Sequence, residues 1–145
     1  MSETDPYAPQ PLARWYYAGA LAAGLVMGLG CLMYVSHVMV DPATLPLDQR
    51  NAVLAEPAWV KAAFAVTVWS GFAGAILLLL RRQTAEPVLL VSLASAVVWI
   101  AGLATTAGLR ASMSVNDWAV MIAIAAIIWT IYWFARHSRQ RGWLR

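Results

Sequence analysis

The chain has 145 residues, of which 61% are hydrophobic and 12% charged, and its formal net charge is +3. A soluble domain is about 45–50% apolar and about 25% charged. This composition therefore excludes a disordered chain, a nucleic-acid-binding domain and an ordinary water-soluble globule. A chain of this length cannot hide so much apolar surface inside itself, and we expect lipid to form part of its solvent.

The first segment, residues 1–14, begins with acidic and polar residues. A secretory signal begins with basic residues and has a short apolar core, whereas the first apolar run here is longer. We therefore interpret that run as a retained helix, preceded by a flexible cytoplasmic segment over residues 1–14.

Four long runs lack Asp, Glu, Lys and Arg, and they cover residues 15–40, 62–80, 88–109 and 118–135. They predict membrane-spanning helices over residues 15–40, 58–80, 88–109 and 118–135. A helix needs about 20 apolar residues to cross a hydrocarbon core about 30 Å thick. The runs do not alternate in polarity as barrel strands do. The sequence predicts an all-α integral membrane protein, a four-helix bundle with antiparallel, up-down topology.

The connections carry the charge. The loop over residues 41–57 contains a possible short interfacial helix, and the last segment, residues 136–145, is a basic tail. Seven of the ten Lys and Arg residues lie on the side of both termini, and three (Arg50, Lys61 and Arg110) lie on the other side. The positive-inside rule then predicts that both termini are cytoplasmic, in a bacterial inner membrane.

The basic tail predicts contact with anionic lipid, with Trp143 and Leu144 as a membrane anchor. The candidate lipid-interface residues are Arg136, Arg139, Arg141 and Arg145.

Small and hydroxyl-bearing residues recur at spacings of three and four along the predicted helices, and such residues mediate helix packing in lipid. A repeat of about 3.5 residues predicts left-handed packing. The first predicted helix has the row Ala20, Gly24 and Gly28, and the second has the row Ala63, Thr67, Ser70 and Gly74. The last predicted helix has the row Ala119, Ala123, Ala126, Thr130, Trp133 and His137. A candidate polar seam consists of Thr67, Ser70, Ser92, Ser95, Thr106 and Thr130. These hydroxyls either serve packing alone or line the site of a neutral ligand, to which the deep Trp99 and Trp129 would add stacking surfaces.

No predicted span has Asp, Glu, Lys or Arg in its middle, which argues against a proton-coupled exporter and an ion pump. Sequence motifs of nucleotide, hydrolase and metal sites are absent, so we expect no enzyme, cofactor or metal. His37, near the outer end of the first span, is either an interfacial hydrogen-bonding group or a cofactor ligand. A lipid-acting enzyme would require Asp48, Glu56, Asp117 and Arg110 to gather on the outer side.

The layout resembles a group of small four-helix membrane proteins of proteobacteria, some of which are labelled "sugar transporter". The resemblance rests on four segments. They are Pro57-Ala58-Trp59 followed by residues 63–66 at the start of the second predicted helix, residues 77–82 at its end, Glu86-Pro87 before the third predicted helix, and the last residues, 141–145. It implies transport but no particular binding residues.

We expect a non-enzymatic structural or accessory protein that binds lipids and associates with itself or with another membrane protein. The alternative is a small transporter or binder of a neutral solute such as a sugar, acting as a dimer.

Overall fold

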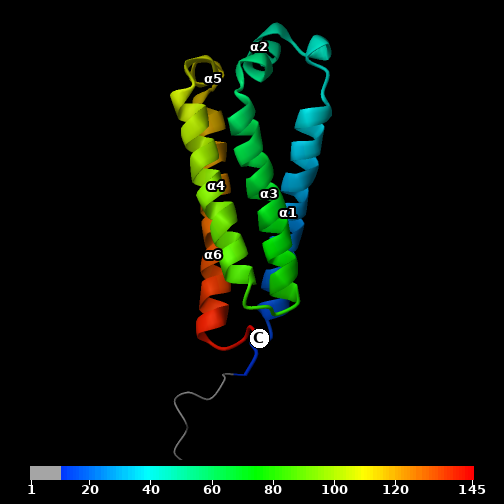
Figure 1. Cartoon of the computed structure of the whole chain (residues 1–145), viewed down its shortest axis with the longest axis vertical. Coiled ribbons are helices and arrows are strands. Elements are labelled where there is room, and N and C mark those ends of the chain that lie inside the picture. Colours follow the sequence, from blue (N-terminus) through cyan, green and yellow to red (C-terminus); the bar gives the residue numbers. More distant parts are fainter. Residues whose placement is uncertain (1–10) are drawn as a thin grey trace, which may run out of the picture.

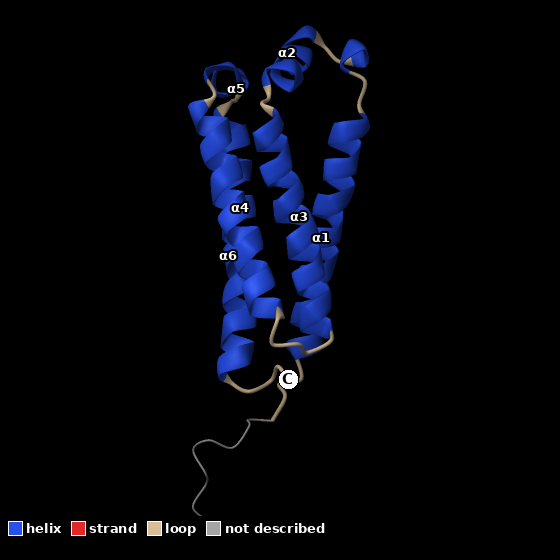
Figure 2. Cartoon of the chain, viewed as in Figure 1, coloured by secondary structure: helices blue, strands red, loops and turns tan. Residues whose placement is uncertain are grey.

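The structure is a computed structural model, which describes residues 11–145. Four long helices lie side by side: α1 (Tyr16–Met39), α3 (Ala58–Leu79), α4 (Ala85–Thr105) and α6 (Val115–Gln140) (Figure 1). Three short helices, η1 (Pro42–Thr44), α2 (Leu47–Ala55) and α5 (Ala107–Ser112), lie together at one end of the bundle (Figure 2). We call this the loop end, and the opposite end, where the chain terminates, the tail end. The described part of the chain contains no strand.

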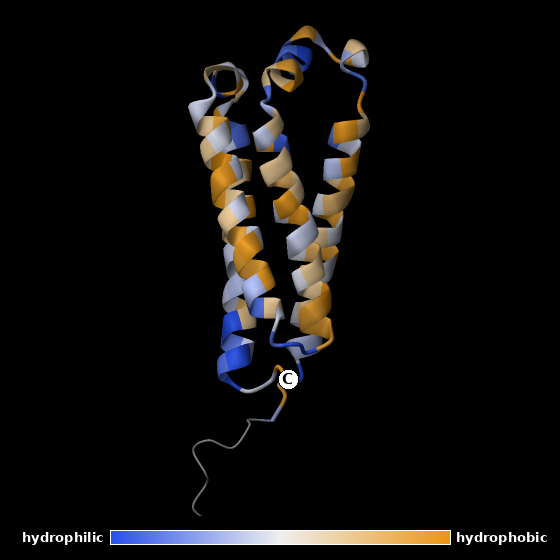
Figure 3. Ribbon diagram, in the orientation of Figure 1, coloured by the Kyte–Doolittle hydropathy of each residue, from blue (hydrophilic) through white to orange (hydrophobic). Residues whose placement is uncertain are grey.

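Each of the four long helices is long and apolar enough to cross a membrane. Hydrophilic residues gather at the two ends of the bundle, while the middle of each helix is mostly apolar (Figure 3). The predicted all-α fold of four apolar spans is confirmed, and it fits a multi-pass membrane protein. Left-handed packing stays a prediction.

Of the segment predicted to be flexible, residues 1–14, the first ten residues lie outside the described part of the chain. Leu12 and Ala13 are partly buried against the core, so the chain joins the bundle before α1 begins.

Two helices differ from their predicted bounds for local reasons. Helix α4 begins at Ala85, because Pro87 falls in the first turn, where its missing N–H has no helical partner to lose. Helix α4 ends at Thr105, since Thr106 is extended with ψ 107° and starts α5.

Helix α6 begins three residues before the predicted start and ends at Gln140. Ser114 and Asp117 form a capping box, in which the serine side chain accepts from the Asp117 backbone N–H and the carboxylate accepts from the Ser114 backbone N–H. Basic residues are favourable in the last turn of a helix, so 136–140 continue α6 instead of beginning a separate tail.

The last residues of the chain form what we call the C-terminal clamp, residues 142–145 bound to the turn at 81–83. Gly142 has φ 69°, and its N–H and that of Trp143 return to the carbonyls of Arg139 and Ser138, a Schellman turn. Arg145 then pairs with the turn, donating its N–H to the Arg81 carbonyl (2.6 Å) and accepting from the Gln83 N–H (3.1 Å).

Trp143 and Leu144 are each only 4% exposed and belong to the same core cluster as Tyr16. The prediction that they anchor the tail in lipid is therefore wrong. The turn at Gly142 directs both side chains back onto the protein, which sequence composition cannot reveal.

Close packing is concentrated on α3, which lies against α1 and α4, while α4 also packs on α6. Leu89 lies over Gly74, where an added Cβ would come within 2.6 Å of the leucine Cγ. The Ser92 hydroxyl donates to the Thr67 carbonyl across the same interface (2.7 Å). Small residues of α3 thus accept larger side chains from α4.

The small-residue row predicted on α1 packs within the chain only in part, and the row predicted on α6 is mostly exposed. On α1, Ala20 is buried and an added Cβ at Gly28 would lie 3.5 Å from the Phe72 ring, but an added Cβ at Gly24 would meet nothing within 4 Å. On α6 the predicted row is exposed except for the half-buried His137, and larger residues face the bundle instead; they are Ile128, Ile131, Tyr132, Phe134 and Ala135. The spacing of small residues in the sequence identifies such rows, but it does not show which of them faces a neighbouring helix.

Candidate functional site: an apolar cavity between the spans

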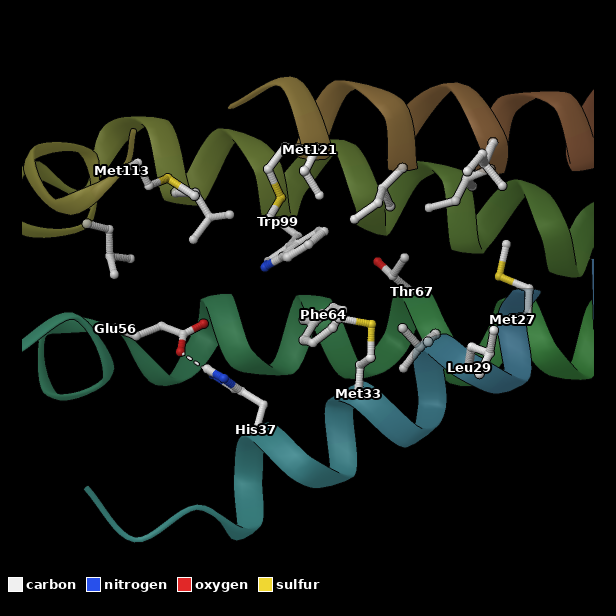
Figure 4. Close-up of a pocket in the computed structure, with 18 of the residues that line it drawn as sticks. Met27, Leu29, Met33, His37, Glu56, Phe64, Thr67, Trp99, Met113 and Met121 are labelled. Carbon is white, nitrogen blue, oxygen red and sulfur yellow. Dashed lines mark hydrogen bonds and ion pairs between the residues drawn. The ribbon is translucent and has the colours of Figure 1, made fainter. Parts of the chain in front are cut away.

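A cavity of about 560 Å³ lies in the half of the bundle nearest the loop end. It extends between α1, α3, α4 and α6, with α2 and α5 over its end (Figure 4). Near the tail end the first and last spans meet, where an added Cβ at Gly19 would be 3.2 Å from the Phe134 ring. Elsewhere α1 and α6 are not a closely packed pair, which leaves the space between them open.

The lining of the cavity is almost entirely aliphatic, thioether and aromatic. Its polar side chains are His37, Glu56 and Thr67, together with the indole N–H of Trp99. The Thr67 hydroxyl donates to the Ala63 carbonyl of its own helix (2.9 Å), so the other three groups carry the site's polar chemistry.

His37 and Glu56 join the last turn of α1 to the residue that follows α2, just before α3 begins. His37 Nε2 lies 2.8 Å from Glu56 Oε2, and the Glu56 side chain is only 7% exposed. An ionised carboxylate has no proton to give, so the imidazole donates from Nε2. The other oxygen of Glu56 points away from His37, into the cavity (Figure 4).

Two stacked rings form one wall of the cavity. Phe64 and Trp99 lie with ring centroids 4.5 Å apart and planes 15° from parallel, and Tyr34 meets Phe64 edge-on at 5.6 Å. Trp99 is 6% exposed. Within the described part of the chain its N–H donates to no group, and it points toward the loop end (Figure 4).

The cavity opens sideways, between α1 and α6. Lining residues on these two helices are well exposed, for example Met33 at 67% and Val120 at 54%, whereas Thr67 and Trp99 on α3 and α4 are buried. Ala52 and Val53 of α2 line the loop end of the cavity. In a membrane, the lateral opening would face acyl chains.

The residues of the predicted polar seam do not share one surface. Thr67 alone among them lines the cavity, and Ser92 is buried between α3 and α4. Three others donate to carbonyls four residues earlier in their own helix or at its end, which satisfies a hydroxyl without any ligand; these are Ser70, Thr106 and Thr130. Ser95 is half-buried on α4, away from the cavity lining.

The two deep tryptophans proposed as stacking surfaces lie in different places. Trp99 lines the cavity, but Trp129 is 58% exposed on the outside of α6. Glu56 is the partner that sequence reasoning did not assign to His37. The available signal was that His37 lies shortly before the 41–57 loop and Glu56 near its end, because this loop returns the chain to the same end of the bundle.

The outer acidic residues have separate local roles. Asp117 accepts from the backbone N–H and hydroxyl of Ser114, each at 2.7 Å, while Glu56 binds His37. Residues 11–145 contain no group of three or more His, Cys, Asp or Glu side chains placed to hold a metal.

At the tail end, Arg139 donates to Glu86 of α4 at 2.7 Å. Beside it, a groove of about 280 Å³ on α6 is lined by Trp129, Tyr132, Trp133, Arg136, His137 and Gln140. Contact of the predicted arginines with anionic lipid stays a prediction.

Comparison with known proteins adds no relative: no family model, curated protein or solved structure matches the chain.

Proposed function

We propose that the protein binds a lipophilic small molecule within the membrane. The single observation that supports this is the apolar cavity of about 560 Å³, with its lateral opening between α1 and α6. Small-molecule sites are mostly apolar, with a few placed polar groups and volumes of about 300–1,000 Å³. Because α2 and α5 cover the loop end, a ligand dissolved in the bilayer reaches the cavity more directly than a ligand dissolved in the water at that end.

A lipophilic ligand fits the lining better than the sugar-like solute considered from the sequence. A sugar loses hydrogen bonds to water over most of its surface, and each group left without a partner costs about 1–3 kcal/mol. The cavity offers such partners only near His37, Glu56 and Trp99. We therefore retain the binding role and propose a different class of ligand.

Filling the cavity tests this function. Met121 of α6 points into the cavity (Figure 4), whereas the next residue, Ile122, is 69% exposed on the outside. We expect saturable photolabelling of cavity residues by a diazirine-bearing dodecane, in protein reconstituted in phosphatidylcholine nanodiscs. Met121→Trp should abolish this labelling, and Ile122→Trp should leave it unchanged. Equal labelling of both variants, or no saturable labelling of the original protein, would contradict the proposal.

A second candidate function is that of an accessory subunit, and the exposed row on α6 favours it. Ala119, Ala123, Ala126 and Thr130 are all exposed, and a row of small residues lets another helix approach closely. The partner would be a second copy or another membrane protein.

Size measurement of the gently extracted protein tests the accessory role. Ala123→Trp should reduce the mass of the native complex, while Val97→Trp on the exposed side of α4 should not. A wild-type protein that is monomeric and without a partner in native-like lipid would rule out this candidate.

A further inference from the structure

We propose that the ligand of the cavity is a long-chain alcohol, an amphiphile whose hydroxyl head binds at Glu56 and Trp99 and whose apolar chain extends toward the middle of the membrane. This inference rests on the proposed binding function and specifies the chemistry of its ligand.

The acceptor at the head position is the second carboxylate oxygen of Glu56. Its first oxygen is occupied by His37 Nε2 at 2.8 Å, and the second points into the cavity (Figure 4). This oxygen remains an acceptor whether or not His37 carries a second proton. A bound head must therefore supply a hydrogen-bond donor.

The donor at the head position is the indole N–H of Trp99. The Trp99 residue is only 6% exposed, it lines the cavity, and its N–H makes no hydrogen bond to any described residue. It points toward the loop end, where Glu56 lies (Figure 4). A bound head that displaces solvent from this N–H must therefore also supply an acceptor, because the donor would otherwise lose its hydrogen bond.

A hydroxyl is the simplest group that both donates and accepts. Ethers, esters and ketones only accept, so they would leave Glu56 without a donor. Ammonium groups only donate, so they would leave Trp99 without an acceptor. Carboxylates and phosphates would be repelled by the Glu56 carboxylate at short range.

The order of polar and apolar groups along the cavity fits an amphiphile oriented like a lipid of the nearer leaflet. Its polar groups lie at the loop end, while Met27 and Ile128 line its deeper part. The chain could pass between α1 and α6 without any polar barrier, because the exposed lining there is apolar.

The test compares two competitors of nearly equal size, dodecanol and dodecyl methyl ether, against a diazirine-bearing dodecanol in the nanodisc-reconstituted protein. We expect dodecanol to compete at about tenfold lower concentration, the ratio that loss of one charge-assisted hydrogen bond produces. Replacing both partners, His37→Leu with Glu56→Leu, avoids an unpaired buried charge and should remove the preference. Asp48→Leu, which removes an exposed carboxylate from α2, should retain it.

A second variant covers the case in which the double replacement does not fold. Trp99→Phe keeps a ring beside Phe64 but removes the N–H, and it should weaken the binding of both oxygen-bearing competitors relative to dodecane. Equal competition by alcohol and ether, or a preference that survives in the double variant, overturns the alcohol assignment while leaving the binding function intact. Absence of saturable cavity labelling by the dodecane probe would instead remove the proposed function itself.

Discussion

Gly74 shows how one residue sets the distance between two spans. Its missing side chain is replaced by Leu89 of α4, whose Cγ would lie 2.6 Å from an added Cβ. Gly24 of α1 lies in the same kind of predicted row but faces open space. The two glycines are chemically alike, and only their neighbours distinguish them.

Substituting alanine at these two positions should give opposite results. Gly74→Ala must displace Leu89, and we expect the free energy of unfolding to fall by about 1–3 kcal/mol. Gly24→Ala should be neutral or stabilising by up to about 1 kcal/mol, because alanine favours the helix. Reversible unfolding in mixed micelles measures both values. Equal loss of stability in the two variants would contradict the packing described for Gly74.

The hydroxyls of Ser92 and Thr130 provide a second matched pair. Ser92 donates to the Thr67 carbonyl across α3 and α4, whereas Thr130 donates to the Ala126 carbonyl of its own helix. Ser92→Ala should cost about 0.6 kcal/mol, the average for interhelical hydrogen bonds in membranes. Thr130→Val should leave the free energy of unfolding unchanged within about 0.3 kcal/mol, since it breaks no contact between helices. The same unfolding measurement compares them, and a larger loss for Thr130→Val would refute this assignment.

At the scale of elements, the C-terminal clamp joins α6 to the turn between α3 and α4. Arg81 has φ 57°, which is unusual for a side-chain-bearing residue, and its Nε donates to the Trp143 carbonyl at 2.8 Å. Trp143 packs edge-on against Trp15 and Tyr16, with ring centroids 5.9 Å away in each case. The clamp therefore connects the start of α1 and the end of α6 to the turn between α3 and α4.

Removing the Trp143 ring should disrupt this end of the bundle. We expect Trp143→Ala to lower the free energy of unfolding by about 3–5 kcal/mol, as for other large aromatic side chains removed from a core. Trp133→Ala is the matched control, since Trp133 is 55% exposed on α6 and should cost far less. Thermal unfolding of the two variants in the same detergent compares them. A mild effect of Trp143→Ala would show that the clamp does not stabilise the bundle.

At the scale of the whole molecule, the four spans close at the tail end and remain apart at the loop end on the α1–α6 side. At the tail end, Phe134 packs near Gly19 and brings α6 against α1. At the loop end, the His37–Glu56 pair holds α1 to the start of α3. This asymmetry creates the cavity, and the excess of basic residues at the tail end predicts which end is cytoplasmic.

Orientation can be measured with single cysteines in a Cys31→Ala background. A cysteine in place of the exposed Gln49 of α2 should react with a membrane-impermeant maleimide on intact cells, because the loop end is predicted to face outward. A cysteine in place of the exposed Gln140 should react only after the cells are opened. Labelling of Gln140→Cys from outside would reverse the predicted topology.

Some features follow from residue order alone. The four spans depend on runs of apolar residues, because a helix in lipid satisfies its own backbone and needs only sufficient length. The start of α6 at Ser114 was likewise readable in principle, since a capping box involves residues only three apart.

The cavity and its polar end could not be predicted in the same way. His37 and Glu56 are nineteen residues apart, and Trp99 comes from a third helix. These three residues line one cavity only because α1 diverges from its neighbours and because particular rows of small residues face inward. Lipid is as apolar as the bundle interior, so the polarity of a residue does not reveal whether it faces protein or acyl chains. The sequence by itself therefore determined that the chain forms four helices long and apolar enough to cross a membrane, whereas only the tertiary structure decided which faces meet and where a space remains between them.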